Sequence, residues 1–513
     1  MTIQKSAVAF TLIAAAFSLM ITSLAAADDA IPVYTPGGSE KSPRPNVLLI
    51  CVDDLRNCLK AKGGQIAKVP NLDRLAAEGR YFKRHYVQSA ICGPSRCSLL
   101  TGRRVINAWD LWAADRKLPS RPEVPVSFAD HFQRHGYETV SIGKISHEPG
   151  GTMPPDYRIP QVPFSWDKAF APSAQWKSPW HAFFAYSEGN AYNAVIRWTK
   201  DETPRLPFES ANVGDEGYAD YHIAQAGIGE INRLADGDRP FLLAVGFFKP
   251  HLPHNAPTKY WDMFPEASVG MPDNFFPPEN VDPAITIHKS NELTSHYHWP
   301  LGLGNFDRST IINQRRAYYA TTAYVDAQIG RLLDAFRDSP AVKNTIVVLW
   351  SDHGWKLGEH RMFSKVTNFE IDTNSPLIIH TPGISKPGMT SDALVETVDI
   401  YPTLADLCGL PRPTGLAGQS LRPIIEDPAV QGKPCAYSAI RGGGGHLGHS
   451  VRTDRYRLVH WIKAGKVAQV ELYDHLTDPG ENKNIAAEHR ETVARLGELL
   501  PSRMKEVTLK SRP

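Results

Sequence analysis

The chain has 513 residues, of which 42% are hydrophobic and 21% charged, and this balance excludes an intrinsically disordered protein. The formal net charge is only +2, so no nucleic acid is expected as a partner held by bulk positive charge. Six cysteines are too few for a disulfide scaffold, although Cys408 and Cys435 could pair in an exported protein. The length predicts two or three domains, or a large α/β enzyme that exceeds the usual domain size.

The first 27 residues are typical of a secretory signal peptide. Lys5 supplies a positive start, residues 7–24 are apolar, and three alanines at 25–27 provide a cleavage site. An uncleaved membrane anchor is the competing interpretation, but the alanines that dilute the apolar run favour cleavage. No other stretch is long and apolar enough to span a bilayer, and no lipobox cysteine follows the signal. We therefore expect residues 28–45 to be a flexible leader of an exported protein, periplasmic or secreted, without a stable membrane span.

Helices and strands alternate along residues 46–430. The expected strands are the apolar, often β-branched segments 46–52, 138–142, 241–248, 345–350 and 376–380. The expected helices cover residues 71–79, 128–135, 219–234 and 314–336. This alternation predicts an α/β catalytic domain with a largely parallel sheet and helices on both faces.

The pattern changes after about residue 430. A strand pair is expected over residues 451–461, with a turn at Thr453-Asp454, and a short strand over 471–474. Residues 491–504 are expected to be helical. Residues 431–513 are therefore predicted to form a small subdomain, an antiparallel sheet with a C-terminal helix.

Residues 92–102 contain the most informative motif of the chain. Pro94 suits the first turn of a helix, and Gly102 suits the position just past its end. Cys92 is therefore expected at a helix N-terminus, where free amides and the helix dipole favour an anion. Arg96 lies one turn further on the same face, where its guanidinium could clamp an oxyanion. The alternative to a functional role is that Cys92 is a structural thiol and Arg96 a surface arginine.

Polar residues follow four of the expected strands. They are Asp53 with Asp54, Lys144 with His147, His251, and Asp352 with His353. In open α/β sheets, sites form at the carboxyl ends of the strands, whereas a turn or helix cap would explain each group taken singly. The three carboxylates would repel one another unless a hard cation such as Ca²⁺ or Mg²⁺ neutralised them.

The motif at residues 92–102 matches C-x-P-S-R-x-x-x-L-T-G at every fixed position, so the chain resembles the formylglycine-dependent (type I) sulfatase family. Residues 143–147 match that family's G-K-x-x-H form, and residues 249–251 match its K-P-H turn. Lys365 follows the block D-H-G-x-x-L-G-E-H of residues 352–360, and fits the family spacing better than Lys356. The histidine after the aspartate in this block is similar to iduronate-2-sulfatase-like members. The resemblance covers roughly residues 45–410, and the C-terminal part more loosely.

The resemblance implies an alkaline-phosphatase-like α/β fold, a large mixed, mostly parallel sheet between helices, and an enzyme that hydrolyses sulfuric esters. A separate maturation enzyme would oxidise Cys92 to formylglycine, whose hydrate attacks sulfur and forms a covalent sulfo-enzyme intermediate. One Ca²⁺ would be held by Asp53, Asp54, Cys92, Asp352 and His353. Because His353 replaces the commoner asparagine, contact with the sulfate or support of a ligand from behind are alternatives for it.

The implied catalytic residues are Cys92, Arg96, Lys144, His147, His251 and Lys365. The arginine and the two lysines would hold the hydrate and the sulfate oxygens. His251 would be the general acid for the leaving sugar oxygen, with Lys365 as the alternative. His147 would accept the proton whose removal ejects sulfate.

The expected substrate is a sulfated polysaccharide containing uronic acid, or its oligosaccharides. Loops within residues 150–220 and 255–310 are rich in Trp, Tyr, His and Pro and are expected to line the substrate cleft, although these aromatics could equally pack beneath the loops. A phosphoester or phosphonate hydrolase of the same superfamily is one rival, and an inert sulfoglycan-binding protein is another. A third is a chain in which Cys92 stays a thiol.

Overall fold

The computed structural model describes residues 44–105, 118, 120–153, 158–196, 203–299, 305–384 and 386–500. The expected signal peptide and nearly all of the leader lie outside these residues. The chain from Arg44 onward clusters as one compact unit, so the expected limits of its parts, including the one near residue 430, stay predictions. Among the described residues, no helix combines the length and the apolar character needed to cross a bilayer.

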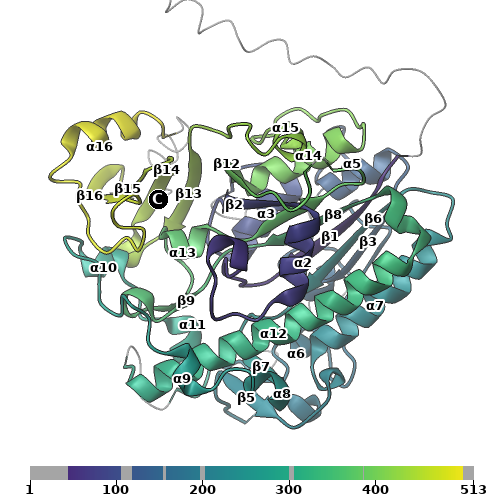
Figure 1. Ribbon diagram of the computed structural model, residues 1–513, viewed down its shortest axis with the longest axis horizontal. Helices are drawn as coiled ribbons and strands as arrows, with labels where there is room; N and C mark the ends of the chain where they lie inside the picture. The colour runs from purple at the N-terminus through teal and green to yellow at the C-terminus, as the bar shows by residue number, and fades with distance from the viewer. Residues whose placement is uncertain are drawn as a thin grey trace, which may run out of the picture. The chain divides into compact units, whose positions relative to one another are not determined.

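An eight-stranded mixed sheet forms the centre of this unit (Figure 1), in the order β12-β2-β11-β8-β1-β6-β3-β4. Strand β11 runs antiparallel to β8 and to β2, and the other neighbouring pairs are parallel. The strands are β1 Asn46–Val52, β2 Arg80–Tyr86, β3 Glu138–Gly143, β4 Lys168–Phe170, β6 Phe241–Phe247, β8 Thr345–Ser351, β11 Leu377–His380 and β12 Ser391–Glu396. The expectation of a mixed, mostly parallel sheet is confirmed.

Helices cover both faces of the sheet, as Figure 1 shows. One face carries α2 Pro70–Glu78, α7 Ala219–Ala235 and α12 Arg308–Asp338, and the other carries α3 Cys92–Thr101, α5 Phe128–Arg134, α14 Ile400–Leu407 and α15 Arg422–Glu426. Successive side chains of β1 point to opposite faces, so Leu48, Ile50 and Val52 join one core and Val47, Leu49 and Cys51 the other. This two-sided burial explains why β1 is a continuous apolar run.

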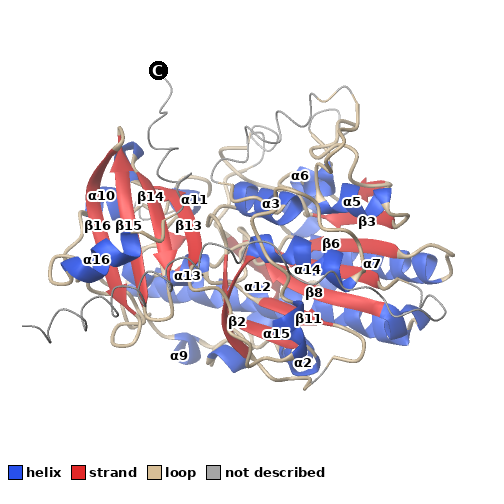
Figure 2. Cartoon of the chain, turned by 90° about the horizontal axis from the view of Figure 1, so that it is seen from above, coloured by secondary structure: helices blue, strands red, loops and turns tan. Residues whose placement is uncertain are grey.

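A separate four-stranded antiparallel sheet follows in the C-terminal part (Figure 2), in the order β13-β14-β15-β16. Its elements are β13 Ala436–Arg441, β14 Leu447–Arg452, β15 Tyr456–Lys463, β16 Lys466–Asp474 and the helix α16 Arg490–Gly497. Strand β13 contacts β2 and β12 of the large sheet. The expected antiparallel sheet with a helix is present. Strand β16 is longer than predicted, because the expected strand covered only residues 471–474.

Short elements fill the long connections. They are α6 Pro179–Phe183, α8 Thr258–Trp261, α9 Glu266–Val269, α10 Pro283–Thr286, α11 Asn291–Thr294 and α13 Glu370–Thr373, with the strand pairs β5 Phe208–Ala211 and β7 His254–Pro257, and β9 Lys356–Leu357 and β10 Phe363–Ser364.

Two expectations need correction. Cys408 and Cys435 do not form a disulfide, and none of the six cysteines, each within the described residues, is disulfide-bonded. The helix expected from residue 314 begins at Arg308, because the Asp307 side chain accepts a hydrogen bond from the Thr310 amide, 2.7 Å away, and caps the helix there.

Candidate active site

The four polar groups that follow strands meet at one edge of the sheet. Their strands are neighbours in the order β8-β1-β6-β3 and run parallel, so their carboxyl ends coincide. The Asp54 amide donates to the Asp352 carboxylate over 3.0 Å, which joins the end of β1 to the end of β8. Lys144, after β3, lies 2.5 Å from the Asp53 carboxylate, which joins β3 to β1.

Cys92 is the first residue of α3, and Gly102 ends this helix in the left-handed conformation, with a φ of 64°. The thiol is buried, and its Sγ lies 3.3 Å from Nε2 of His353. Ser95 fixes the first turn by donating to the Asp352 carbonyl over 2.5 Å. Burial, followed by the negative charge of Asp53, raises the pKa of the Cys92 thiol to about 12. As a plain cysteine it would therefore be a weak nucleophile.

The donor atoms of Asp53, Cys92, Asp352 and His353 all lie within 4.8 Å of one another. Asp54 belongs to the same centre, because its carboxylate is 3.4 Å from Nε2 of His353. All three aspartates are fully buried. Burial raises the pKa of Asp54 well above its usual range and also raises that of Asp352, where the neighbouring Asp53 adds to the effect. Carboxylates whose ionisation is opposed by burial and by a neighbouring carboxylate fit a site for a hard divalent cation. The charge of such a cation would offset the repulsion between the three aspartates.

Arg96 and Lys144 both contact Asp53, and Arg96 also contacts Asp352. The Arg96 Nε lies 2.9 Å from the Asp352 carboxylate, and another guanidinium nitrogen lies 3.2 Å from Asp53. Its third nitrogen donates to the main-chain carbonyls of Lys144 and Ile145. Burial opposes ionisation of Asp53, but Lys144 and Arg96 together hold the pKa of this carboxyl well below its usual range. Of the three carboxyls, Asp53 is therefore the one whose ionised form the surroundings favour.

Lys365 and His251 lie beside Asp54, the third aspartate of the centre. The Lys365 Nζ lies 3.0 Å from both oxygens of Asp54. The His251 Nε2 lies 3.9 Å from Asp54, while its Nδ1 faces the Leu252 carbonyl at 2.7 Å. Burial and then the charge of Lys365 lower the pKa of His251 to about 4. The same segment 249–251 carries Lys249, whose ammonium is buried and donates to the carbonyls of His251 and Pro253, and so braces the histidine.

Sequence reasoning missed Glu292 of α11. One oxygen of its carboxylate, Oε1, lies 2.7 Å from Lys365 Nζ and 3.2 Å from His251 Nε2. No motif marks this glutamate, and only its place in the loop region 255–310, which was expected to reach the cleft, pointed toward it.

His147 lies at the margin of the centre. Its Nδ1 is 3.7 Å from the Glu148 carboxylate, and its ring lies 6.2 Å from that of Trp180. Burial lowers the pKa of His147, so the neutral imidazole is favoured. Helix α6 supplies further aromatic contacts, because the Phe183 ring lies 4.2 Å from Lys144 Nζ and 4.6 Å from the His251 ring. At least part of the aromatic loop therefore packs against the site itself.

The C-terminal sheet also supports the centre. Ile91, which precedes Cys92, and Val366, which follows Lys365, pack against a small core that includes Ile440 and Trp461. The Val366 amide donates to the Ala90 carbonyl over 3.3 Å, which ties the two segments together. By contrast, Lys356 is turned away and pairs with Asp372 and Thr367.

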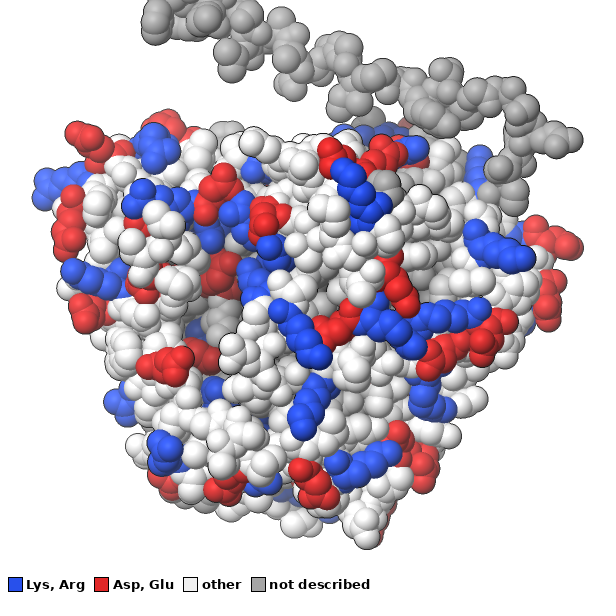
Figure 3. Space-filling view, in the orientation of Figure 1, with Lys and Arg blue, Asp and Glu red and all other residues white. Residues whose placement is uncertain are grey.

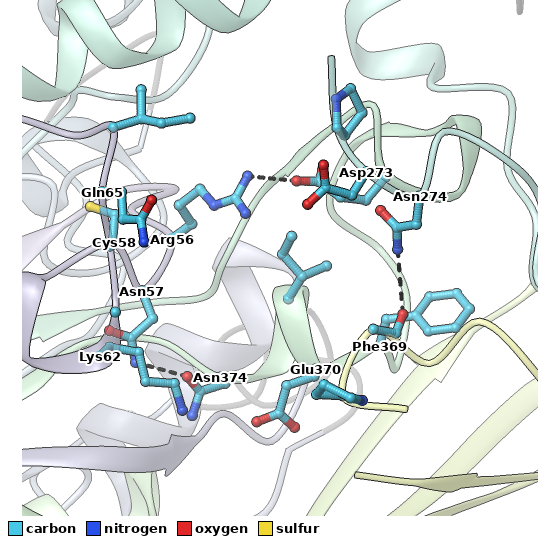
Figure 4. Close-up of a pocket in the computed structure, with 18 of the residues that line it drawn as sticks. Arg56, Asn57, Cys58, Lys62, Gln65, Asp273, Asn274, Phe369, Glu370 and Asn374 are labelled. Carbon is cyan, nitrogen blue, oxygen red and sulfur yellow. Dashed lines mark hydrogen bonds and ion pairs between the residues drawn. The ribbon is translucent and has the colours of Figure 1, made fainter. Parts of the chain in front are cut away.

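A polar cavity of about 800 Å³ lies elsewhere and contains none of these residues (Figure 4). Its walls include Arg56, Asn57, Asn374 and Glu370. Many of its polar groups are satisfied within the protein: Arg56 donates to Glu359 over 3.0 Å, and Asn57 donates to Asn374 over 2.7 Å. The face in Figure 3 mixes acidic and basic side chains, in keeping with the small net charge. We therefore assign the chemistry to the centre around Cys92.

Comparison with known proteins agrees with this assignment. The sequence matches the family model described as "Sulfatase" over residues 45–410, and the one described as "N-sulphoglucosamine sulphohydrolase, C-terminal" over residues 358–509. A sulfatase of Formosa agariphila is 31% identical over 454 residues, covering 86% of this chain and 83% of the relative. Iduronate 2-sulfatase of Homo sapiens is 28% identical over 526 residues, covering 86% of this chain and 90% of the relative.

Among solved structures, the phosphonate monoester hydrolase of Silicibacter pomeroyi shares the fold with a TM-score of 0.70, at 24% identity over 89% of this chain and 94% of that one. This likeness concerns the fold alone. The sulfatase family model, by contrast, spans the strand ends, Cys92 and Lys365 together. The chain therefore belongs to the sulfatase family, and its activity is the hydrolysis of sulfuric esters.

Proposed function

We propose that the protein removes sulfate from a sulfated carbohydrate that contains uronic acid, either a polysaccharide or its oligosaccharides. The observation that carries this proposal is the position of Cys92 at the start of α3, with its sulfur 3.3 Å from His353 in the buried aspartate centre. The similarity to human iduronate 2-sulfatase supports the uronate part.

The reacting group would be Cys92 after oxidation to formylglycine by a separate maturation enzyme, since its hydrated aldehyde supplies the hydroxyl that takes the sulfate group covalently. Asp53, Asp54 and Asp352 would hold one Ca²⁺, which supplies positive charge to the sulfate oxygens. His353 fits as a further ligand, because its Nε2 faces Cys92 and Asp54 while its Nδ1 is 3.0 Å from the Gly354 carbonyl.

The remaining residues would bind sulfate and move protons. Lys144 lies 2.5 Å from Asp53 and Lys365 lies 3.0 Å from Asp54, and both would contact sulfate oxygens. Arg96 donates a hydrogen bond from Nε to Asp352 and forms an ion pair with Asp53 at 3.2 Å, which supports a role in positioning these carboxylates. His251 would give a proton to the leaving sugar oxygen, with Lys365 as the alternative donor, and the neutral His147 would accept the proton whose loss releases sulfate. Because the pKa of His251 is lowered to about 4, its role requires that it take up a proton beside the Glu292 carboxylate, 3.2 Å away, before the ester is cleaved.

The test is sulfate release from a 2-O-sulfated uronate disaccharide, with and without Ca²⁺. The protein sample must show the aldehyde on the Cys92 peptide by mass spectrometry. Release that requires Ca²⁺ is expected. No release from a sample with the aldehyde would refute the uronate substrate.

A phosphonate or phosphate ester hydrolase is the second candidate function, and the shared fold with a phosphonate monoester hydrolase favours it. Relative rates on matched sulfate and phosphonate esters separate the two. A merely sulfoglycan-binding protein would have little need for Cys92, Lys144, His251 and Lys365 around one centre.

We also propose that the chain is exported and cleaved after residue 27. N-terminal sequencing of the protein recovered from the periplasm or the medium should begin at Asp28. A mature protein that keeps residues 1–27 would contradict cleavage.

A further inference from the structure

Glu292 is the carboxylate that links the two candidate proton donors. Its Oε1 is shared by Lys365 Nζ at 2.7 Å and His251 Nε2 at 3.2 Å. Its other oxygen, Oε2, accepts a hydrogen bond from the Ser364 hydroxyl over 2.5 Å. The carboxylate is thus held at both oxygens, which gives it a defined position beside the reacting group.

Glu292 also lies nearer to solvent than its partners. Its side chain is 20% exposed, whereas that of His251 is 9% and that of Lys365 is 4% exposed. Burial opposes its ionisation, but Lys365 keeps the pKa of Glu292 well below its usual range. An ionised carboxylate at this place has room to accept a hydrogen bond from outside the protein.

The leaving oxygen of a substrate must come to His251 Nε2 or to Lys365 Nζ to receive its proton. Both nitrogens face Oε1 of Glu292. An oxygen on a carbon next to the ester can therefore come within hydrogen-bond distance of this carboxylate. A hydroxyl there can donate a charge-assisted hydrogen bond, whereas a second sulfate there would be repelled.

We infer that Glu292 selects sulfate esters whose neighbouring carbon carries a free hydroxyl, and that it discriminates against vicinal disulfates. This inference rests on the proposed function, because it takes His251 and Lys365 as the groups that face the leaving oxygen. It makes Glu292 a specificity-determining residue. If Glu292 only held the lysine and the histidine in place, its substitution would affect all sulfate esters alike.

The experiment compares two substrates on the matured enzyme with Ca²⁺. One is the 2-O-sulfated uronate disaccharide with its free 3-hydroxyl, and the other is the 3-deoxy analogue. The wild type should show a kcat/KM about ten- to hundredfold higher for the hydroxyl substrate, the effect of one hydrogen bond to a charged group.

The variant Glu292→Gln keeps the shape and removes the charge. Its kcat/KM should fall about five- to tenfold more for the hydroxyl substrate than for the deoxy one, and Glu292→Ala should abolish the discrimination. Glu266→Gln is the matched control, because its side chain in α9 is 63% exposed and pairs only loosely, at 3.7 Å, with Arg316. It should leave both rates unchanged.

The outcomes separate the two levels of proposal. No release from the hydroxyl substrate by wild-type enzyme with the aldehyde would refute the uronate substrate of the proposed function. Release at equal rates from both substrates by wild type would refute the role of Glu292 while the function stands. Equal losses on both substrates in Glu292→Gln would reduce Glu292 to a positioning residue. Because the wild-type comparison needs no variant, a folding defect in Glu292→Ala cannot obscure the result.

Discussion

Two regions of the molecule bring carboxylates and a histidine within reach of one another, with opposite consequences. One is the active centre of Asp53, Asp54 and Asp352 around Cys92. The other, which we term the C-terminal ion-pair cluster, consists of Glu370, Glu481, His475, Arg452 and Arg457. In this cluster Arg457 lies 2.6 Å from both Glu370 and Glu481, and Arg452 lies 3.0 Å from Glu370.

The pKa shifts express the difference. Burial opposes ionisation of Glu370, but Arg452 holds its pKa well below the usual range, and Arg457 lowers that of Glu481 to about 2. At the active centre, burial raises the pKa of both Asp54 and Asp352. Proximity of acids and histidine therefore does not by itself define a metal site. The distinguishing feature is that burial keeps the pKa of Asp54 and Asp352 raised although Lys365 and Arg96 lie beside them, whereas the arginines of the C-terminal ion-pair cluster outweigh the burial of its glutamates.

The largest expected effect concerns Cys92 of the active centre, because this residue is the proposed source of the nucleophile. Cys92→Ala should lower sulfate release by about 10³-fold or more, since the group that takes the sulfate is removed. Thermal unfolding followed by circular dichroism should show that the fold is kept. Wild-type turnover by this variant would refute a covalent mechanism at Cys92.

The next effect concerns the C-terminal ion-pair cluster. Arg457→Met leaves Glu370 and Glu481 without their shared partner, so the free energy of unfolding should fall by about 3–5 kcal/mol. Denaturant titration measures this loss. Lys386→Met is the control, because its pair with Asp427 is half exposed on both sides, and it should change stability by less than about 1 kcal/mol. Equal losses in the two variants would contradict the importance of burial.

Ca²⁺ should act on the active centre alone. At 100 times the dissociation constant, Ca²⁺ should stabilise the protein by about 2.7 kcal/mol, seen as a rise in Tm. Asp54→Asn should abolish this rise, whereas Glu370→Gln in the other cluster should retain it. A rise in Tm that survives in Asp54→Asn but is lost in Glu370→Gln would place the ion in the C-terminal ion-pair cluster instead.

Acid should destabilise the C-terminal ion-pair cluster as its carboxylates become protonated. The folded pKa of Glu481 is lowered from 4.5 to about 2, so its contribution to stability is present above pH 4.5 and is lost as the pH falls toward 2. Glu481→Gln should therefore reduce the slope of unfolding free energy against pH in this window by about 1.4 kcal/mol per pH unit. Asp54 and Asp352 have raised pKa values, and in the absence of Ca²⁺ their protonation should instead favour the fold as the pH falls. An unchanged slope in Glu481→Gln would contradict the lowered pKa.

Much of the fold could be predicted from local patterns. The apolar runs at β1, β3, β6 and β8 and the alternation with helices indicated a parallel sheet, and a parallel sheet brings its strand ends to one edge. Strand β2 was not predicted, because its sequence RYFKRHY carries four basic residues. The structure explains the strand: Arg80 is buried and donates to the carbonyls of Met389 and Ile425, at 2.6 and 2.9 Å.

The sequence by itself determined that polar residues follow four strands, that a helix begins at Cys92, and that the chain resembles the sulfatase family. Each of these depends on residues close together in the chain. Only the tertiary structure decided that Glu292 reaches His251 and Lys365, that Lys356 turns away to Asp372, and that Cys408 and Cys435 stay apart. Such contacts join segments far apart in the sequence. Their formation depends on how all the intervening elements pack against one another, and local periodicity in the sequence does not encode this packing.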